Sequence, residues 1–386
     1  MRILMYSAIF PPAIGGPATQ CFNLCKALVE RGEVPIVVTY GSNFSSNEDQ
    51  GFKVMTFRLR YTYTPLDKAL RWVIFPLYIS FIFQKEKIDI LHCHSASAAS
   101  FLAGFLAKIF GIPSVIKFAG DWVWETLSTY KLQAKNFDEM YEKSWLARAM
   151  VRVEKVGLNL FDKIWVVSDF RRENIKTLLG NDKKVVMINN CLLLRGGGAR
   201  NFKEGEMITV ISASRYIPHK RLPFLVELFA LSDIPNSKLV LIGSGSDQEV
   251  DLVKEAIKKF KVEDRVMVRG ILESNRVYEE FSKASFYIST SIEEGLPNVF
   301  IEAMHYGLPI ITADAGGCRE MVLNNKTGFV VDVYDKETFL EKIKILSTDT
   351  DLRTQMSHEA FERSKLFNLE HKIGEFLKMY QDLLSK

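Results

Sequence analysis

Short apolar runs alternate with longer amphipathic segments along most of the chain. The short runs, rich in Val, Ile and Leu and bounded by Gly, Pro or Ser, predict buried β-strands. The longer segments carry apolar residues three or four positions apart and predict helices that cover a sheet. Strands followed in turn by helices are typical of a doubly wound parallel sheet. In the first half the expected strands are Arg2–Ser7, Pro35–Thr39, Asp89–His94, Ser114–Phe118, Ile164–Val167 and Val185–Ile188. The expected helices run from Pro17 to Gly32, from Ser100 to Phe110, over about Asp138–Phe161 and from a cap at Ser168.

A glycine-rich break interrupts this alternation at Leu194–Asn201, which contains three consecutive glycines. Such a composition predicts an interdomain linker. The alternation then restarts, and it ends in a long helical segment, Asp351–Leu384, with a break near Phe367. We therefore expect two α/β domains, 1–194 and 195–367, with a C-terminal helix of about 368–386 that returns to the first. The strands expected in the second are Met207–Ser212, Lys238–Ile242, Val266–Val268, Phe286–Ser289, Leu308–Thr312 and Gly328–Val331.

The first strand runs into a Pro/Gly loop that ends at Gly15 and Gly16, before the helix opened by Pro17. A strand, a glycine loop and a helix in this order put the loop at the carboxyl edge of a parallel sheet. Glycine there allows a ligand to approach the backbone closely. The alternative is that Gly15 and Gly16 only permit the turn.

Two acids eight positions apart, Glu294 and Glu302, flank a turn and a helix start. Gly295, Leu296 and Pro297 form the turn, a helix is expected from Asn298, and Gly307 ends it. A helix start presents free N–H groups and positive dipole charge, which suit a phosphate. Carboxylates beside it suit sugar hydroxyls, although two such acids are also common on solvated surfaces.

Two cations, Arg215 and Lys220, follow the first strand of the second half. Arg offers a planar fork and Lys a point charge to phosphate oxygens, so the pair is a candidate diphosphate site. The nearby Gly243-Ser244-Gly245 is a weak signal on its own, because Gln248 stands where the dinucleotide pattern needs a third glycine.

Composition excludes several classes of protein. With 47% hydrophobic and 25% charged residues and a net charge of +4, the chain is an ordinary globular protein with no basic tract for nucleic acid. The five scattered cysteines form neither a disulfide framework nor a zinc pattern, and a reducing cytoplasm fits them best. Cys21 and Cys25 share a helix face and are expected to be core thiols. His92 and His94 are expected to be structural or to line a cleft, without binding metal.

The most apolar segment is Trp72–Phe83, which Pro76 interrupts and which is too short to span a bilayer. It is either a buried helix or a membrane-facing one. Arg58, Arg60, Lys68 and Arg71 precede it, and such cations beside an aromatic segment suit an anionic membrane.

Together the Glu294–Glu302 stretch, the following Gly-Gly, the Arg215/Lys220 pair and the Gly15-Gly16 loop resemble the retaining nucleotide-sugar-dependent glycosyltransferases of family four. The resemblance covers nearly the whole chain and implies the GT-B fold, two facing Rossmann-like domains with a cleft between them. It also implies a metal-independent reaction without a cofactor, in which a nucleotide-diphosphate sugar is the donor substrate.

Roles follow from the resemblance position by position. Arg215 and Lys220 would neutralise the donor diphosphate, Glu302 would bind ribose and Glu294 would lie near the moving sugar. The backbone of Gly295, Leu296, Pro297 and Asn298 would hold sugar hydroxyls and phosphate. Gly15 and Gly16 would close over the diphosphate from the other domain, Gly243 would border the donor, and Arg269-Gly270-Ile271 would border the base.

One departure concerns the strand Ser114–Phe118, at whose end many relatives carry a His. This chain has Phe118-Ala119-Gly120-Asp121 instead. Asp121 is the nearest polar substitute and could act as a base or orient the acceptor hydroxyl. The alternative is that Asp121 only caps the following turn.

The resulting hypothesis is a retaining glycosyltransferase that uses a nucleotide sugar and a saccharide or lipid-linked acceptor. We expect it in the cytoplasm or at the inner face of the membrane, in envelope polysaccharide, lipopolysaccharide or exopolysaccharide assembly. The rivals are a sugar-nucleotide epimerase on the same fold, which would form product from the donor alone, and a non-catalytic scaffold.

Overall fold

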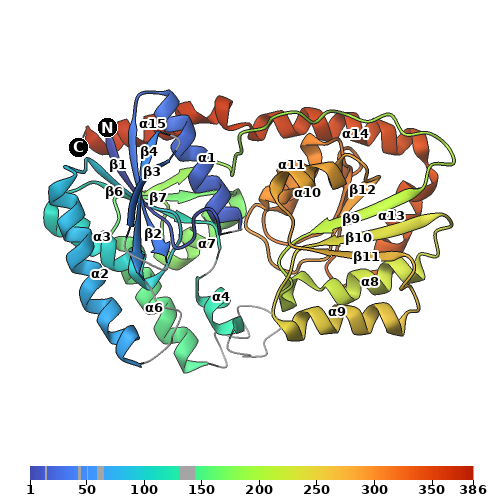
Figure 1. The fold of residues 1–386 in the computed structure, drawn as a ribbon, viewed down its shortest axis with the longest axis horizontal. Coiled ribbons are helices and arrows are strands. Elements are labelled where there is room, and N and C mark those ends of the chain that lie inside the picture. Colours follow the sequence, from blue (N-terminus) through green and yellow to red (C-terminus); the bar gives the residue numbers. More distant parts are fainter. Residues whose placement is uncertain are drawn as a thin grey trace. The chain divides into compact units, whose positions relative to one another are not determined.

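A computed structural model describes residues 1–13, 15–41, 45–49, 51–58, 65–120, 122–129 and 144–385. The chain divides into two compact units, one formed by Met1–Leu192 with Leu369–Lys386 and the other by Leu193–Asn368. Each unit contains a largely or wholly parallel sheet covered by helices (Figure 1). The predicted α/β class with two doubly wound sheets is confirmed.

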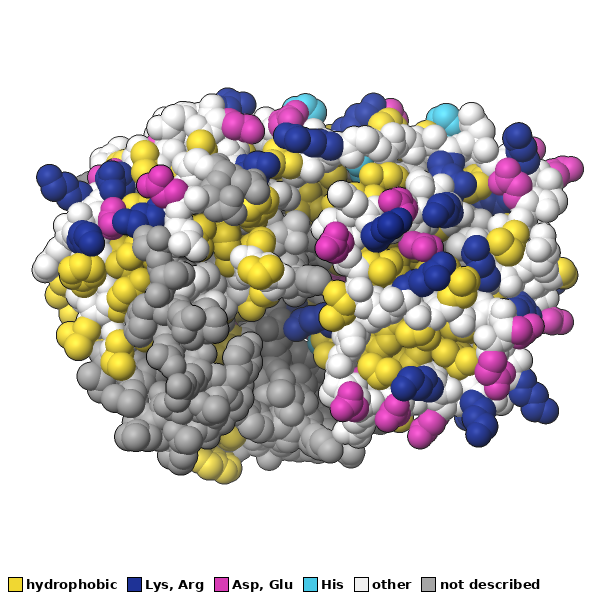
Figure 2. Space-filling model, viewed as in Figure 1, with side chains coloured by type: hydrophobic (Ala, Val, Ile, Leu, Met, Phe, Trp, Pro, Cys, Tyr) yellow, Lys and Arg dark blue, Asp and Glu magenta, His cyan; other side chains and the backbone are white. Residues whose placement is uncertain are grey.

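The described surface carries side chains of both charges, in keeping with the small net charge. Figure 2 shows Lys and Arg interspersed with Asp and Glu over the second unit, with hydrophobic side chains between them. Among the described residues, no helix combines the length and the apolar character needed to cross a membrane.

The first unit is built on an eight-stranded sheet of order β3-β4-β2-β1-β5-β6-β7-β8. All pairs are parallel except β3 with β4. The strands are β1 (Arg2–Tyr6), β2 (Val34–Gly41), β3 (Ser45–Asp49), β4 (Phe52–Arg58), β5 (Ile90–Cys93), β6 (Ser114–Phe118), β7 (Lys163–Val166) and β8 (Val185–Met187). The helices are α1 (Gly16–Glu30), α2 (Pro65–Lys85), α3 (Ala98–Phe110), α4 (Trp122–Thr129), α6 (Trp145–Asn159), α7 (Asp169–Leu179) and α15 (Leu369–Leu384).

Two strands, β3 and β4, and one helix, α4, of this unit are absent from the predicted set. The β3–β4 hairpin lies at the sheet edge, and β3 has the polar sequence Ser-Ser-Asn-Glu-Asp, so no apolar alternation marks it. The pattern did not predict α4 either, whereas the helix expected for the apolar segment Trp72–Phe83 is confirmed as part of α2. The helix predicted for Asp138–Phe161 is shorter: α6 begins at Trp145 after a cap at Ser144, and residues 138–143 lie outside the described residues.

Alternate residues of β5 face two different layers, as strand geometry requires. Leu91 and Cys93 join an apolar core with α2, α3 and α6, which includes Phe75, Ile79 and Phe161. His92 points the other way, toward α15, where its Nδ1 lies 2.6 Å from the hydroxyl of Tyr380. The returning C-terminal helix is thus an integral part of the first unit.

Polar side chains are buried in the layer between the sheet and α15. Lys117 of β6 donates to Gln20 and, at 2.8 Å, to Oδ1 of Asn190, and its Nζ lies 4.3 Å from the ring centre of Trp165. Burial lowers the pKa of Lys117 to about 7 and that of His92 to about 3. His92 and His94 are stacked 4.3 Å apart and buried, so the expectation of structural histidines is confirmed. Cys21 and Cys25 are likewise buried thiols.

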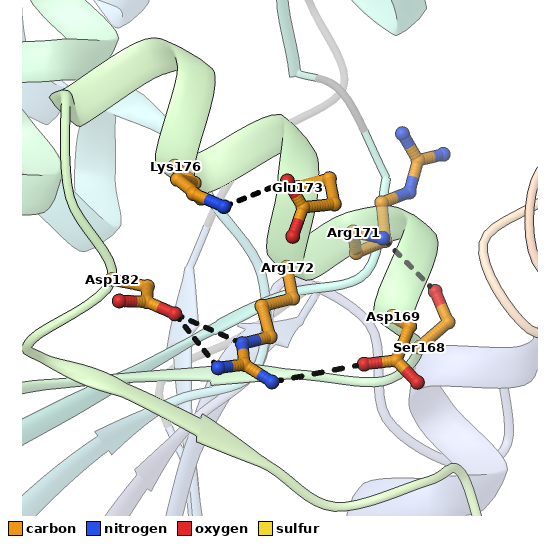
Figure 3. A network of polar contacts seen from close by, with 7 residues as sticks. All are labelled: Ser168, Asp169, Arg171, Arg172, Glu173, Lys176 and Asp182. Carbon is orange, nitrogen blue, oxygen red and sulfur yellow. Dashed lines mark hydrogen bonds and ion pairs between the residues drawn. The ribbon is translucent and has the colours of Figure 1, made fainter.

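The helix α7 begins as predicted, with the hydroxyl of Ser168 accepting from the backbone N–H of Arg171 at 3.2 Å. On its outer face Arg172 bonds Asp182 at 2.9 Å, as Figure 3 shows. The side chain of Arg171 points inward instead, and its Nε donates to the carbonyl of Ala119 at 3.1 Å. Arg171 therefore holds the backbone that leaves β6.

The second unit contains a six-stranded, wholly parallel sheet of order β11-β10-β9-β12-β13-β14. Its strands are β9 (Ile208–Ala213), β10 (Ser237–Ile242), β11 (Val266–Gly270), β12 (Phe286–Ser289), β13 (Ile310–Ala313) and β14 (Gly328–Val331). Its helices are α8 (Leu222–Leu231), α9 (Asp247–Lys259), α10 (Ser274–Phe281), α11 (Asn298–His305), α12 (Cys318–Met321), α13 (Lys336–Thr348) and α14 (Thr350–Ser364), with short 3₁₀ turns η1 (Pro218–Lys220) and η2 (Lys365–Phe367). The break near Phe367 is confirmed.

The glycine-rich segment at 194–201 packs against the second unit. Gly198 donates its N–H to the carbonyl of His305 at 2.9 Å, and Arg200 donates its N–H to the hydroxyl of Ser357 at 2.7 Å. A Cβ on Gly197 would lie 2.4 Å from the same carbonyl, and its φ is 71°. These glycines allow close backbone approach, so the segment predicted as an interdomain linker, which follows the boundary between the units, packs against the second one.

The buried hydroxyl of Tyr380 predicts a testable contribution to the first unit. Replacing Tyr380 with Phe leaves Nδ1 of His92 without its partner, and this should lower the free energy of unfolding by about 1–3 kcal/mol. All five tryptophans, Trp72, Trp122, Trp124, Trp145 and Trp165, belong to the first unit, so urea unfolding followed by tryptophan fluorescence reports this unit selectively. Lys378→Met, on the exposed face of α15, is the control and should leave the urea midpoint unchanged. If Tyr380→Phe also left the midpoint unchanged, the proposed contribution of the Tyr380 hydroxyl to stability would be wrong.

Candidate functional site

The order of strands in the second sheet creates a switch point between β9 and β12. From β9 the chain proceeds outward through β10 and β11, whereas from β12 it proceeds the opposite way through β13 and β14. Ligands of such sheets bind beyond the carboxyl ends of the strands at this point. The loops that follow β9 and β12 are those that carry Arg215, Lys220 and Glu294.

Lys220 and Glu294 form an ion pair at this point, with Nζ 2.6 Å from Oε1. Their side chains are 16% and 11% exposed, so the pair is mostly shielded and open to solvent at one edge. Thr290 donates its hydroxyl to the carbonyl of Lys220 at 2.9 Å, and Ile292 donates its N–H to the carbonyl of His219 at the same distance. Two loops far apart in sequence are thereby joined on both sides of the ion pair.

Arg215 lies on the same loop and is exposed. Its charge reaches the site: the pKa of His219 falls to about 3, first because the ring is buried and then because Lys220 and Arg215 repel a further positive charge. The predicted pair of cations therefore lies around one imidazole, and an anion is the ligand that such a cluster favours.

The glycines at 243 and 245 serve the packing of two loops. Tyr216 donates its N–H to the carbonyl of Ser244 at 2.8 Å. A Cβ on Gly243 would lie 1.9 Å from the carbonyl oxygen of Ser214, and Gly243 has a φ of 123°. Glycine at 243 is therefore required because the backbone of the loop after β9, called here the cation-bearing loop since it carries Arg215 and Lys220, passes so close to it.

The helix α11 begins at Asn298, as predicted, and Gly307 adopts a φ of 65° just after its end. Pro297 occupies the N-cap position with no side-chain cap hydrogen bond. In the preceding turn Leu296 is buried, and the carbonyl of Gly295 accepts from the N–H of Gly317 at 3.2 Å. The turn is thus anchored by its apolar side chain and by its backbone, beside the N-terminus of a helix.

Glu302 lies one turn into α11 and receives a hydrogen bond from the hydroxyl of Tyr278 at 3.2 Å. Burial raises the pKa of Glu302 to about 7, although the hydrogen bond from Tyr278 acts in the opposite direction. Tyr278 of α10 stacks on Tyr306, with ring centres 5.3 Å apart. The sequence gives no signal for Tyr278, since nothing in its local pattern connects it with a residue 24 positions away.

Ile271 follows β11 directly and is 63% exposed, an unusual position for a large apolar side chain. Gly270 before it has a φ of 67°, and Arg269 pairs with Glu280 at 3.3 Å. An exposed isoleucine at the carboxyl edge of the sheet can cover one face of a planar ring.

In the first unit, Gly15 caps α1 and Gly16 begins it, at the carboxyl end of β1. A Cβ on Gly15 would lie 2.9 Å from Cδ1 of Ile9, so the loop is tightly packed there. Asp121, the candidate base, lies outside the described residues, and its role stays a prediction.

A pocket of about 210 Å³ opens beyond the carboxyl ends of β1, β2 and β5 in the first unit. The hydroxyl of Tyr6 donates to that of Tyr40 at 2.7 Å, and Ser97, the N-cap residue of α3, also lines the pocket. Its other lining residues are Ala8, Phe75, Ala98 and Ala99. The lining is mostly apolar and aromatic with a few hydroxyl groups, a surface suited to an amphipathic ligand such as a sugar.

A larger pocket of about 390 Å³ in the second unit lies between the 216–224 segment and α9. Arg221, Phe224 and Glu249 line it, and neither Lys220 nor Glu294 does. It is a separate hollow, on the other side of the cation-bearing loop.

Comparison with known proteins gives matches to both units. A family model described as Glycosyltransferase Family 4 matches residues 14–192, and one described as Glycosyl transferases group 1 matches residues 199–363. The N-acetyl-alpha-D-glucosaminyl L-malate synthase of Bacillus anthracis is 25% identical, over 97% of this chain and 95% of that protein. One subunit of the human phosphatidylinositol N-acetylglucosaminyltransferase is also 25% identical, over 84% of this chain and 64% of that protein.

Solved structures share the fold over the full length. Sucrose-phosphate synthase from Thermosynechococcus elongatus superposes with a TM-score of 0.81 at 19% identity, covering 100% of this chain and 99% of that one. Anabaena HepE, solved in complex with UDP-glucose, gives a TM-score of 0.73 at 17% identity, covering 98% and 100%.

The raised pKa of Glu302 predicts a pH-dependent stability difference. A carboxyl whose pKa is higher folded than unfolded stabilises the fold below its unfolded pKa, and this contribution is lost as the pH rises through about 7. Glutamine at this position mimics the neutral acid. When the pH rises from 5 to 8, the stability of Glu302→Gln relative to the parent should therefore increase by roughly 1–3 kcal/mol. Urea unfolding followed by far-ultraviolet circular dichroism at both pH values measures this; a difference no larger than that of exposed Glu337→Gln would refute the shift.

Proposed function

We propose that this chain, which belongs to the family-four glycosyltransferases of GT-B fold, transfers a sugar from a nucleotide diphosphate to a saccharide or lipid-linked acceptor, with retention at the anomeric carbon. The observation that carries the proposal is the Lys220–Glu294 ion pair at the β9/β12 switch point, with exposed Arg215 on the same loop. A nucleotide sugar needs cations for its diphosphate and acceptors for its hydroxyls, and this site offers both.

In the proposed complex, Arg215 and Lys220 contact the diphosphate. An ammonium group has three N–H donors. Lys220 donates one of them to Glu294, which leaves two for phosphate oxygens. Glu294 thus fixes the position of Nζ and presents its other oxygen toward the transferred sugar. The turn Gly295–Pro297 and the N-terminus of α11 add backbone N–H groups to the same anion.

The nucleoside would bind along the neighbouring strand ends. Glu302 would accept hydrogen bonds from the ribose hydroxyls, with Tyr278 holding the carboxylate in place. Exposed Ile271 would cover the base, and Gly243 would let the donor approach the backbone. Because ribose hydroxyls donate to the ionised carboxylate, donor binding should favour the loss of the proton from Glu302.

The chemistry follows from charge development. When the bond between the anomeric carbon and the phosphate oxygen breaks, negative charge grows on the leaving diphosphate and positive charge grows on the sugar ring. We assign neutralisation of the leaving group to Arg215 and Lys220, and the ion pair with Glu294 holds Lys220 in place before the reaction begins. The carboxylate of Glu294 would stabilise the positive ring.

The acceptor is assigned to the 210 Å³ pocket of the first unit. Tyr6 and Tyr40 would present hydroxyls, and Phe75 an apolar surface, to a saccharide or to the polar end of a lipid. The names of the bacterial and human relatives refer to N-acetylglucosamine, and HepE was solved with UDP-glucose. A UDP-linked sugar, with N-acetylglucosamine as the first candidate, is therefore the donor to test first, and envelope polysaccharide assembly is the pathway class that we propose.

A thermal-shift screen against UDP-, GDP- and ADP-sugars identifies the donor. The cognate nucleotide sugar should raise the melting temperature in proportion to the logarithm of its concentration, and a hundredfold excess over Kd corresponds to about 2.7 kcal/mol. Retention is then read from the anomeric proton coupling of the product by NMR. Product formed from the donor alone would support an epimerase, and an inverted product would exclude the retaining mechanism.

Replacing Lys220 with Met tests its role in catalysis. Loss of one preorganised charge at the leaving group should lower kcat by about 10²–10³-fold. The matched control is Lys336→Met, since Lys336 forms an ion pair with Glu227 at 2.5 Å in the same unit, away from the switch point. If the two variants retain similar activity, the assignment of Lys220 to the leaving group is wrong.

A further inference from the structure

We propose that the outer face of α2, α3 and α6 in the first unit docks on an anionic lipid bilayer. We define this surface, called here the cationic apolar face, by ten exposed apolar and five basic residues of the three helices. The apolar members are Ile74, Leu77, Phe81, Phe105, Ile109, Phe110, Trp145, Leu146, Val153 and Val156. The basic members are Lys85, Lys108, Arg148, Arg152 and Lys155.

The three helices form one continuous surface. A Cβ on Gly157 of α6 would lie 2.3 Å from the ring of Phe101 in α3, so glycine allows these helices to approach closely. Between α2 and α3, the ring centres of Phe83 and Phe110 lie 5.8 Å apart. In Figure 1 the three helices lie side by side on the first unit, and Figure 2 shows hydrophobic side chains along that edge of the molecule.

The apolar side chains of this face are additional to those that cover the sheet. In α2 the residues Phe75, Ile79 and Ile82 are buried in the core, whereas Ile74, Leu77 and Phe81 are 38%, 66% and 52% exposed. The described part of α2 is therefore apolar on both sides. A helix of a water-soluble layer needs only one apolar face, and the second indicates a further apolar environment.

The helix α6 shows the arrangement of charge. Leu146, Val153 and Val156 form an exposed apolar stripe at helical spacing, and Arg148, Arg152 and Lys155 form a basic stripe beside it. Trp145, at the start of the helix, is 74% exposed. An apolar stripe beside basic residues, with an aromatic residue at one end, is typical of helices that lie in the interfacial plane of a membrane.

All exposed charges on the described side chains of the three helices have the same sign. α3 contains no acid, the part of α2 from 74 to 85 contains none, and the single acid of α6, Glu154, is buried. Within the part of the chain that the structure describes, Lys108, Arg152 and Lys155 form no ion pair, while Nζ of Lys85 lies 5.2 Å from the ring centre of Phe81. Unpaired cations such as Lys108, Arg152 and Lys155 favour an anionic partner, and their interleaving with exposed apolar side chains is typical of helices at an anionic lipid surface.

Co-sedimentation of the full chain with vesicles, without donor or acceptor, tests the proposal separately from the proposed function. Vesicles of phosphatidylcholine with about 30% phosphatidylglycerol should bind the protein, and pure phosphatidylcholine should bind it at least roughly tenfold more weakly. Sodium chloride at about 0.5 M should weaken binding to the anionic vesicles, because screening removes the electrostatic part. Equal binding to both vesicle types would overturn the choice of an anionic bilayer.

Two variants with matched controls locate the contact. Arg152→Glu/Lys155→Glu should lower vesicle binding at least roughly tenfold, since each cation near an anionic surface contributes about 1 kcal/mol. Lys258→Glu/Lys261→Glu changes the net charge equally in the second unit and should leave binding unchanged. The apolar variant is Leu77→Ser/Ile109→Ser/Val156→Ser, with Leu231→Ser/Leu366→Ser as its control, all at exposed positions.

The outcomes decide between the possible occupants of the face. Loss of vesicle binding in both face variants, with circular dichroism and melting temperature unchanged, supports the proposal. Unchanged binding of either face variant overturns it. A dimer of the parent chain that the apolar variant dissociates, seen by analytical ultracentrifugation, also overturns it, because the face would then be an interface between copies.

Discussion

The candidate site depends on the adjacency of β9 and β12 in the second sheet. Lys220 and Glu294 are 74 residues apart, and they meet because the two strands pair while their onward connections run in opposite directions. Burying either charge without the other would be unfavourable, because an ion that loses its hydration needs an oppositely charged partner to compensate. The hydroxyl of Thr290 and the N–H of Ile292 bind the backbone of the cation-bearing loop, so the ion pair and the strand order support each other.

Two acids on one short stretch of sequence acquire opposite electrostatic environments from this arrangement. Glu294 faces an ammonium group at 2.6 Å, whereas Glu302 has a tyrosine hydroxyl at 3.2 Å and a raised pKa. A carboxylate held by a cation is positioned to oppose positive charge on a sugar ring. A carboxyl that is desolvated and has no cation beside it can accept hydrogen bonds from the hydroxyls of a ligand, which replace those that water would make. The proposed separation of roles between the moving sugar and the ribose therefore rests on a difference that is present in the free protein.

The sequence predicted the features that are local or periodic. The alternation of apolar runs located most strands and gave the α/β class, and Gly307 and Ser168 marked a helix end and a helix start. It did not predict the polar strand β3, nor the stacking of Tyr278 on Tyr306 beside Glu302, because these depend on which elements become neighbours. The predicted linker shows the same limit: its composition located the segment beside the boundary between the units, but it did not predict that these glycines pack on the carbonyl of His305.

The two faces of the first sheet are completed in different ways. Toward α15 the layer is closed by buried polar contacts, above all those of His92 with Tyr380 and of Lys117 with Asn190. Toward α2, α3 and α6 it is closed by apolar packing. If those helices served only to cover the sheet, their outer positions could carry mixed charge, as α9 does with Asp251, Lys254, Glu255 and Lys258. The helix α7, on the same unit, also exposes paired acids and bases. The absence of exposed acids from the described side chains of α2, α3 and α6 is therefore a property of these helices and not of the unit, and the proposed bilayer contact accounts for it.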